Sequence, residues 1–284
     1  MRRVVSILVL LTLVGGVAVT VGAQPAAAKA ASNRPAEYLA LGDSLAFGFS
    51  PLVNPSNAHN FIGYPNTVAA TLREHLTNAS CPGETSSHLV SLAGSDNGCG
   101  AYRLNFPLHV AYRTTQLAFA DRFLRAHPKT LVVSIDIGAN DLHVLVDGCG
   151  GQANVGCILA GLPSMLATLS ANLDTIYGHI LKLDGYRHKI VALTFYSPNY
   201  SDAMETAVIS QVNQVVAART SAWGGIVADG FGAFAAASSA YGGDTCAAGL
   251  RIVVSSSPLT CDDHPSPAGR DLLAQVIVKA LRHH

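Results

Sequence analysis

The chain has 284 residues, 49% of them hydrophobic, and its 18 Lys and Arg residues balance 18 Asp and Glu residues to give a formal net charge of zero. A domain usually takes about 100–200 residues, and α/β folds often run longer as one unit, so we expect one domain with a sizeable core. Zero net charge argues against a nucleic-acid partner, which calls for a basic surface, and against electrostatic docking on an anionic membrane.

Residues 1–30 are predicted to be a cleaved secretory signal peptide. A basic start, Met1-Arg2-Arg3, precedes an uncharged apolar run from Val4 to Val21, and small residues follow at 21–23 and 26–28. This is the layout of a signal peptide with its cleavage site. The alternative is an uncleaved membrane anchor, because the run is near the lower length limit of a spanning helix. We expect a secreted mature domain over residues 31–284, with no stable membrane insertion after cleavage.

The mature chain alternates short apolar strands with helical periods. In chain order we expect a strand at 38–41, helical stripes at Val68–Leu72–Leu76 and Leu117–Leu124, a strand at 131–137, a helix at 162–180, strands at 189–195 and 225–228, and a closing helix at 272–281. Apolar strands alternating with helices indicate a mainly parallel sheet covered on both faces. The predicted fold is a single three-layer α/β/α domain of the flavodoxin-like kind.

Six cysteines lie in the mature part, an even number that suggests disulfides in a secreted protein. Their positions fall into three local pairs, each within one loop, which suggests Cys81–Cys99, Cys149–Cys157 and Cys246–Cys261. A zinc site is a weak alternative, because no Cys-x-x-Cys or Cys-x-x-His pair occurs. We expect no bound metal.

Ligands of open α/β sheets bind outside the carboxyl ends of the strands, and the loop after the first strand holds a serine. It reads Gly42-Asp43-Ser44-Leu45. Unpaired backbone N–H groups at a helix start can stabilise a negative oxygen beside Ser44. The alternative is that Ser44 is a plain helix N-cap.

Two further loops offer hydrogen-bond donors. After the strand at 131–137 comes Gly138-Ala139-Asn140-Asp141, in which the Asn140 amide can donate to a developing oxyanion. The loop Cys81-Pro82-Gly83-Glu84-Thr85 can direct the backbone N–H of Gly83 into a site. Both loops also have the composition of ordinary turns.

The loop before the closing helix reads Cys261-Asp262-Asp263-His264-Pro265. A histidine beside a carboxylate is the base and orienting group that a serine nucleophile needs. Of the eleven histidines, only His264 has this setting. The alternative is an unrelated histidine near a helix start.

The order of these blocks resembles the four conserved blocks of the SGNH (GDSL) hydrolase family. Gly-Asp-Ser-Leu comes first, then a glycine loop, then Gly-x-Asn-Asp, and last Asp-His-Pro, so that the resemblance spans residues 38–281. The Cys-Pro-Gly-Glu-Thr segment and the six cysteines are similar to those of secreted actinobacterial members. The family's fold is a parallel sheet between helices.

The resemblance implies that Ser44 is the nucleophile and His264 its general base. The backbone N–H groups of Ser44 and Gly83 and the side-chain amide of Asn140 would form the oxyanion hole. One position departs from the family pattern, in which the acid lies three residues before the histidine, because Cys261 stands there. Asp262, Asp263 or a backbone carbonyl would then orient His264, with Asp262 favoured by some actinobacterial members.

The expected activity is hydrolysis of lipid or fatty-acyl esters through an acyl-Ser44 intermediate, by a monomer that needs no cofactor. Phe47, Phe49, Leu52 and Val53 follow the serine and would line an acyl pocket or belong to the core. Alternatives on the same site are a carbohydrate acetylesterase, a phospholipase and a thioesterase. A non-catalytic secreted binding protein is the alternative of another class. We expect Asp43 and Asp141 to hold their loops through side-chain to backbone bonds.

Overall fold

Five parallel strands form the central sheet in the order β2-β1-β3-β4-β5. They are β1 (Glu37–Gly42), β2 (His75–Asn78), β3 (Thr130–Asp136), β4 (Lys189–Leu193) and β5 (Ile226–Ala228). The computed structural model describes residues 35–183 and 185–284. The expected signal peptide at residues 1–30 lies outside the described residues.

The central strands are buried on both faces. Along β1, Tyr38 and Ala40 belong to one core cluster, whereas Leu39 and Leu41 belong to the other. Because successive side chains of a strand point to opposite faces, a continuous apolar run suits a sheet that is covered on both sides.

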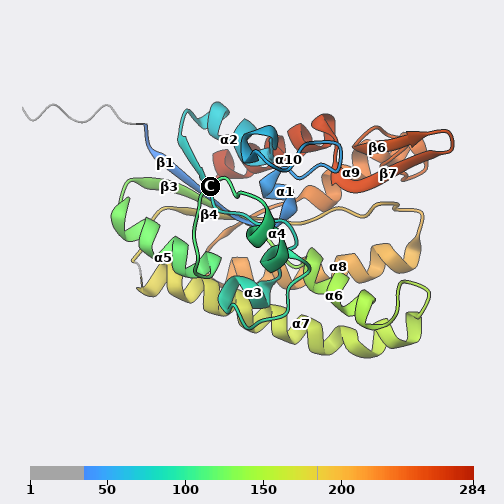
Figure 1. Cartoon of the computed structure of the whole chain (residues 1–284), viewed down its shortest axis with the longest axis horizontal. Coiled ribbons are helices and arrows are strands. Elements are labelled where there is room, and N and C mark those ends of the chain that lie inside the picture. Colours follow the sequence, from blue (N-terminus) through green and yellow to red (C-terminus); the bar gives the residue numbers. More distant parts are fainter. Residues whose placement is uncertain (1–34, 184) are drawn as a thin grey trace, which may run out of the picture. The chain divides into compact units, whose positions relative to one another are not determined.

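Helices cover each face of this sheet (Figure 1). One core cluster packs against α2 (Tyr64–Leu72), α9 (Gly230–Ser238) and α10 (Pro267–His283). The other packs against α3 (Ser86–Val90), α5 (Gln116–Ala126), α7 (Val155–Gly178) and α8 (Ala203–Ala222). The expected three-layer α/β/α arrangement with a parallel sheet is confirmed.

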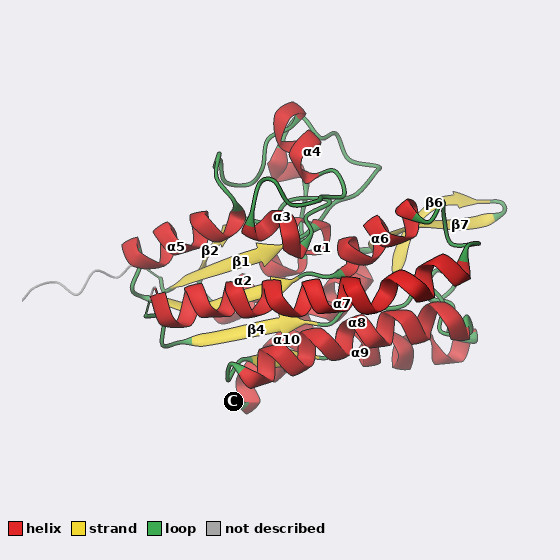
Figure 2. Cartoon of the chain, turned by 90° about the horizontal axis from the view of Figure 1, so that it is seen from below, coloured by secondary structure: helices red, strands yellow, loops and turns green. Residues whose placement is uncertain are grey.

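The remaining elements lie in the connections. Three short helices are α1 (Ser44–Phe47), α4 (Cys99–Asn105) and α6 (Ala139–Gly148). An antiparallel hairpin pairs β6 (Arg251–Ser256) with β7 (Leu259–Pro265). Figure 2 shows this hairpin at the end of the molecule toward which the strands of the central sheet point. Single turns of other helix types occupy Ala58–Asn60, His179–Leu183 and Ser239–Tyr241.

The predicted helical stripe through Leu76 was wrong beyond Leu72. Helix α2 ends where Arg73 takes a left-handed conformation with φ of 59°. The chain then turns into β2, in which Leu76 pairs with Tyr38 of β1. Pairing with a neighbouring strand therefore overrides a spacing of four residues that is also compatible with a helix.

Helix α7 together with its extension to Lys182 is long and apolar enough, by length and composition alone, to cross a membrane. Its inner face carries Leu169, Leu173 and Ile176, which are fully buried in the core between the sheet and the neighbouring helices. One face of α7 therefore packs in the core of the domain.

Candidate active site

Ser44 is the first residue of α1, directly after the carboxyl end of β1. Asp43 caps this helix, and its Oδ1 atom accepts a hydrogen bond from the backbone N–H of Leu45 at 2.9 Å. Gly42 has a φ of +130°, and a Cβ there would stand 2.4 Å from the carbonyl oxygen of Asp136, so only glycine fits. This turn places Ser44 at the sheet edge where open α/β folds bind ligands.

His264 and Asp262 lie on β7, whereas the sequence predicts a loop at these residues. The hairpin has a bulge here, because Arg251 pairs with Pro265 and Val253 with Cys261. Within this bulge His264 Nδ1 lies 2.5 Å from Asp262 Oδ1. The backbone N–H of His264 donates to the same oxygen at 3.0 Å. Asp263 instead pairs with Arg251 at 2.6 Å. These contacts favour Asp262 among the three orienting groups that the sequence left open.

The hydrogen bond between Asp262 and His264 also affects where the proton between them lies. The hydrogen bond with His264 holds the pKa of Asp262 below its ordinary value. An ionised Asp262 only accepts hydrogen bonds, so Nδ1 of His264 carries the proton and Nε2 is available as a base. The ring of Phe49 packs against the imidazole with centroids 4.8 Å apart, which adds a second constraint on the orientation of His264.

Asn140 is buried at the start of α6, and both ends of its amide are held. Its Oδ1 atom accepts a hydrogen bond from Asn97 Nδ2 at 2.8 Å. Its Nδ2 atom donates to Asp43 Oδ2 at 3.2 Å. Because an amide nitrogen has two hydrogens, one remains for a ligand. Asn97 therefore fixes which end of the Asn140 amide is the donor.

Two buried carboxyl groups, Asp43 and Asp136, lie beneath the serine turn. Burial and the charge of Asp43 raise the pKa of Asp136 well above its ordinary value, and Tyr64 donates to Asp136 Oδ1 at 2.6 Å. Asp43 accepts from Leu45 and Asn140. Burial raises the pKa of Asp43 as well. Because two adjacent buried carboxylates do not both ionise, the pair holds at least one proton.

Gly83 lies in the loop that the Cys81–Cys99 disulfide closes. Its φ is +78°, and a Cβ there would stand 2.2 Å from the carbonyl oxygen of Asn97. The carbonyl of Gly83 accepts a hydrogen bond from the backbone N–H of Asn97 at 2.9 Å. The close approach of these two segments requires glycine, and it ties the Gly83 loop to the residue that orients Asn140.

Ser44, Asn140, Asp262 and His264 line one cavity of about 700 Å³. Gly83 is not among the lining residues, although its partner Asn97 is. Away from these four residues the cavity runs between α6, α7 and α8, where its wall is largely apolar but also includes His143, Asp202 and Glu205. That wall includes Leu142, Val146, Ile158, Leu159, Val208 and Ile209.

The structure joins the cysteines as Cys81–Cys99, Cys149–Cys157 and Cys246–Cys261, the three pairs suggested by their positions. Cys81, Cys99 and Glu84 are the one group of possible metal ligands that cluster among the described residues. Both cysteines are oxidised to the disulfide and offer no thiolate, so this group does not fit a metal ion.

Several features of the site were missed or left undecided by sequence reasoning. Asn97 sits in an unremarkable polar segment, and α8 was not predicted at all. Phe47 and Phe49 pack against Phe61 with ring centroids 5.0 and 5.9 Å apart, and neither lines the cavity. The expectation for Asp141 agrees with the structure, since its carboxylate accepts from the backbone N–H of Ser86 at 2.9 Å.

The chain matches the sequence profile of the GDSL-like lipase/acylhydrolase family over residues 40–272. Its fold is similar to that of an extracellular lipase from Streptomyces rimosus, with 20% identity, a TM-score of 0.58, and 86% of this chain and 99% of the other covered. The fold is also similar to that of phospholipase A1 from Streptomyces albidoflavus, with 20% identity and a TM-score of 0.56. This similarity covers 87% of this chain and 99% of the phospholipase chain. An acetylxylan esterase from Geobacillus stearothermophilus has a similar fold, with 19% identity and a TM-score of 0.53. This similarity covers 87% of this chain and 94% of the esterase chain. No curated protein sequence matches the chain significantly.

Proposed function

This chain belongs to the GDSL-like lipase/acylhydrolase family, and from this premise we propose that it is a secreted serine esterase or lipase that hydrolyses lipid or fatty-acyl esters through an acyl-Ser44 intermediate. The observation that carries the proposal is the convergence of Ser44, Asn140 and the Asp262–His264 pair on one cavity. These residues come from the ends of β1 and β3 and from the hairpin, which are far apart in the sequence.

In the first half of the reaction, Ser44 Oγ attacks the ester carbonyl carbon while His264 Nε2 takes the hydroxyl proton. Asp262 keeps Nδ1 protonated and stabilises the imidazolium without accepting its proton. The tetrahedral oxyanion receives hydrogen bonds from the backbone N–H groups of Ser44 and Gly83 and from Asn140 Nδ2. Each such preorganised donor typically contributes about 2.7–4 kcal/mol in the transition state.

Collapse of the tetrahedral intermediate breaks the bond to the alkoxide, which leaves as the alcohol with the proton from His264. In the second half, His264 takes a proton from water, and the resulting hydroxide attacks the acyl-Ser44 carbonyl carbon. A second tetrahedral intermediate in the same oxyanion hole then releases the carboxylic acid, and the proton returns to Ser44 Oγ. Neither half requires a metal or an organic cofactor.

The apolar wall of the cavity supports a fatty-acyl substrate. Leu142, Ile158 and Val208 line the same cavity as Ser44, and an acyl chain attached to Ser44 would extend along them. Removal of apolar surface from water contributes about 0.8 kcal/mol per buried methylene. Such a wall therefore favours longer acyl groups over acetyl groups.

Hydrolysis of p-nitrophenyl esters from acetyl to palmitoyl tests the proposal. We expect the purified mature protein to be active and Ser44→Ala to lower kcat by at least about 10³-fold, because it removes the nucleophile. Circular dichroism of the variant controls for folding. Full activity of folded Ser44→Ala would disprove the assignment of the nucleophile, and a folded wild type that is inactive on every ester would favour a binding protein.

Secretion and a monomeric state belong to the same proposal. Three disulfides support an oxidising compartment, and the layout of residues 1–30 supports cleavage of a signal peptide. N-terminal sequencing of the protein from the culture medium identifies the cleavage site. Recovery with an intact N-terminus in the membrane fraction would favour the anchor.

A further inference from the structure

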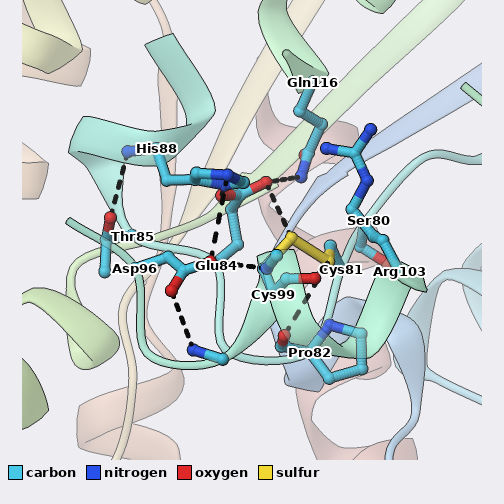
Figure 3. The surroundings of a disulfide bond; sticks show 12 residues. Ser80, Cys81, Pro82, Glu84, Thr85, His88, Asp96, Cys99, Arg103 and Gln116 are labelled. Carbon is cyan, nitrogen blue, oxygen red and sulfur yellow. Dashed lines mark hydrogen bonds and ion pairs between the residues drawn. A yellow bond between two sulfur atoms is a disulfide. The ribbon is translucent and has the colours of Figure 1, made fainter. Parts of the chain in front are cut away.

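Glu84 is a fully buried carboxylate in the loop beside Gly83, and both of its oxygens have hydrogen-bond partners (Figure 3). Its Oε1 atom accepts from His88 Nδ1 at 2.5 Å, and its Oε2 atom accepts from Gln116 Nε2 at 3.1 Å. The Cys81–Cys99 disulfide lies against the same carboxylate, with Cys99 Sγ 3.6 Å from Oε2.

Gln116 extends this contact to the turn that carries Ser44. The fully buried Gln116 amide accepts from the backbone N–H of Gly42 at 2.5 Å through Oε1. Its Nε2 atom donates to the carbonyl of Gly42 at 3.0 Å. One nitrogen hydrogen thus goes to Gly42 and the other to Glu84, which uses every donor of the amide. Gly42 lies two residues before Ser44, so Gln116 holds both polar backbone atoms at the entry to the turn.

The bridge therefore connects the two segments that supply the backbone donors of the proposed oxyanion hole. One donor is the N–H of Ser44, two residues after Gly42. The other is the N–H of Gly83, immediately before Glu84, which the family resemblance assigns and whose loop meets the cavity lining at Asn97. Oxyanion donors act when they lie about 2.7–3.1 Å from the developing charge. A misplacement of about 1 Å can cost 10²-fold in rate. We therefore expect kcat to depend on the distance between the Ser44 turn and the Gly83 loop.

We propose that Glu84 is a positioning residue for ester hydrolysis, which acts through Gln116 to hold the Ser44 turn in register with the backbone N–H of Gly83. This inference rests on the proposed function. It also explains why the position is a carboxylate, since His88 and Gln116 both donate to it. A glutamine at position 84 would present one acceptor and one donor, so with Nδ1 of His88 protonated it would lose one of the two bonds.

Glu84→Gln and Gln116→Leu test the role, measured as kcat and KM on the p-nitrophenyl ester that the wild type hydrolyses best. We expect each variant to lower kcat by about 10- to 100-fold with KM within about twofold, because the bridge affects the oxyanion in the transition state and not ground-state binding. The double variant should lose no more than the larger single loss, because both changes break the same bridge.

Tyr177→Phe is the matched control. It removes a buried hydrogen bond of 2.7 Å to Thr220, between α7 and α8, and neither residue lines the cavity. We expect it to lower Tm and leave kcat unchanged. Amide hydrogen exchange at Gly42 gives a readout independent of activity, and it should rise in Glu84→Gln and Gln116→Leu but not in Tyr177→Phe.

The outcomes separate the inference from the proposed function. If the wild type hydrolyses esters and folded Glu84→Gln and Gln116→Leu keep kcat within twofold, the positioning role is overturned and the esterase assignment stands. If the double variant loses the product of the two single losses, the two residues do not act as one bridge and the inference is also overturned. If the wild type hydrolyses no ester, the proposed function fails and the positioning role fails with it.

Discussion

The proposed general base has two aspartates immediately before it in the chain, and the hairpin assigns them different partners. Asp262 lies two residues before His264 on β7 and contacts its Nδ1 atom, whereas Asp263 lies against Arg251. Both residues lie in a bulge of the hairpin, which turns Asp262 toward His264 and Asp263 toward Arg251 of the facing strand. An acid two residues before the histidine thus contacts Nδ1 here, where the family pattern has a spacing of three.

Substitution of each aspartate separates the orienting groups. We expect Asp262→Asn to lower kcat by on the order of 10²–10⁴-fold, because an amide stabilises neither the tautomer of His264 nor its imidazolium. The matched Asp263→Asn variant should stay within about threefold of the wild type. The measurement is kcat on a short-chain p-nitrophenyl ester. Equal and small losses in both variants would indicate that a backbone group orients His264.

At the scale of elements, three helices enclose the largely apolar end of the cavity, and of these helices α6 and α7 both follow β3 and α8 follows β4. Helix α6 contributes Leu142 and Val146, and α7 contributes Ile158 and Leu159. Helix α8 contributes Val208, which lines the cavity without belonging to either large core cluster. A larger side chain at this position would therefore fill the cavity and not the core.

Val208→Phe tests whether this wall sets the acyl-chain preference. We expect kcat/KM for the longest ester that the wild type accepts to fall by at least about 10-fold. The value for the acetyl ester should remain within about threefold, because a short acyl group does not reach the wall. Each lost methylene contact corresponds to about 0.8 kcal/mol, or roughly fourfold in rate. A uniform loss across the chain-length series would show that the acyl chain lies elsewhere.

At the scale of the whole molecule, one carboxyl group should make stability depend on pH. Glu74 lies between α2 and β2, and its Oε2 atom is buried without a hydrogen-bond partner among the described residues. Burial raises the pKa of Glu74 from its ordinary value of 4.5 to about 7. Between these values the unfolded chain releases its proton while the folded protein keeps it, so the free energy of unfolding falls as the pH rises.

Glu74→Gln removes this penalty because an amide does not ionise. We expect the variant to exceed the wild type in Tm by about 2–4 °C at pH 8, which corresponds to about 1 kcal/mol once solvent screening of the partly exposed group is taken into account. At pH 4 the two proteins should unfold at the same temperature. Asp147→Asn, which removes an exposed carboxylate, controls for net charge. A Tm difference that is the same at both pH values would contradict the assignment to Glu74.

Much of the fold and of the candidate site could be predicted from the sequence because their signals are local. The apolar runs at 38–41 and 131–137 are continuous because their strands are buried on both faces. Ser44 and Asn140 each follow the end of such a strand, so their places at one edge of the sheet follow from the parallel arrangement. The cysteine pairs are close in the sequence, which limits their partners before any fold is known.

Only the tertiary structure decided which groups contact one another across the chain. The end of α2 depends on pairing between β2 and β1, and the partner of His264 depends on the hairpin that makes its segment a strand. Asn97 orients Asn140 from 43 residues away, and Gln116 holds Gly42 across 74 residues. Such contacts leave no period in the sequence, because they depend on the packing of separate segments and not on the conformation of any one of them.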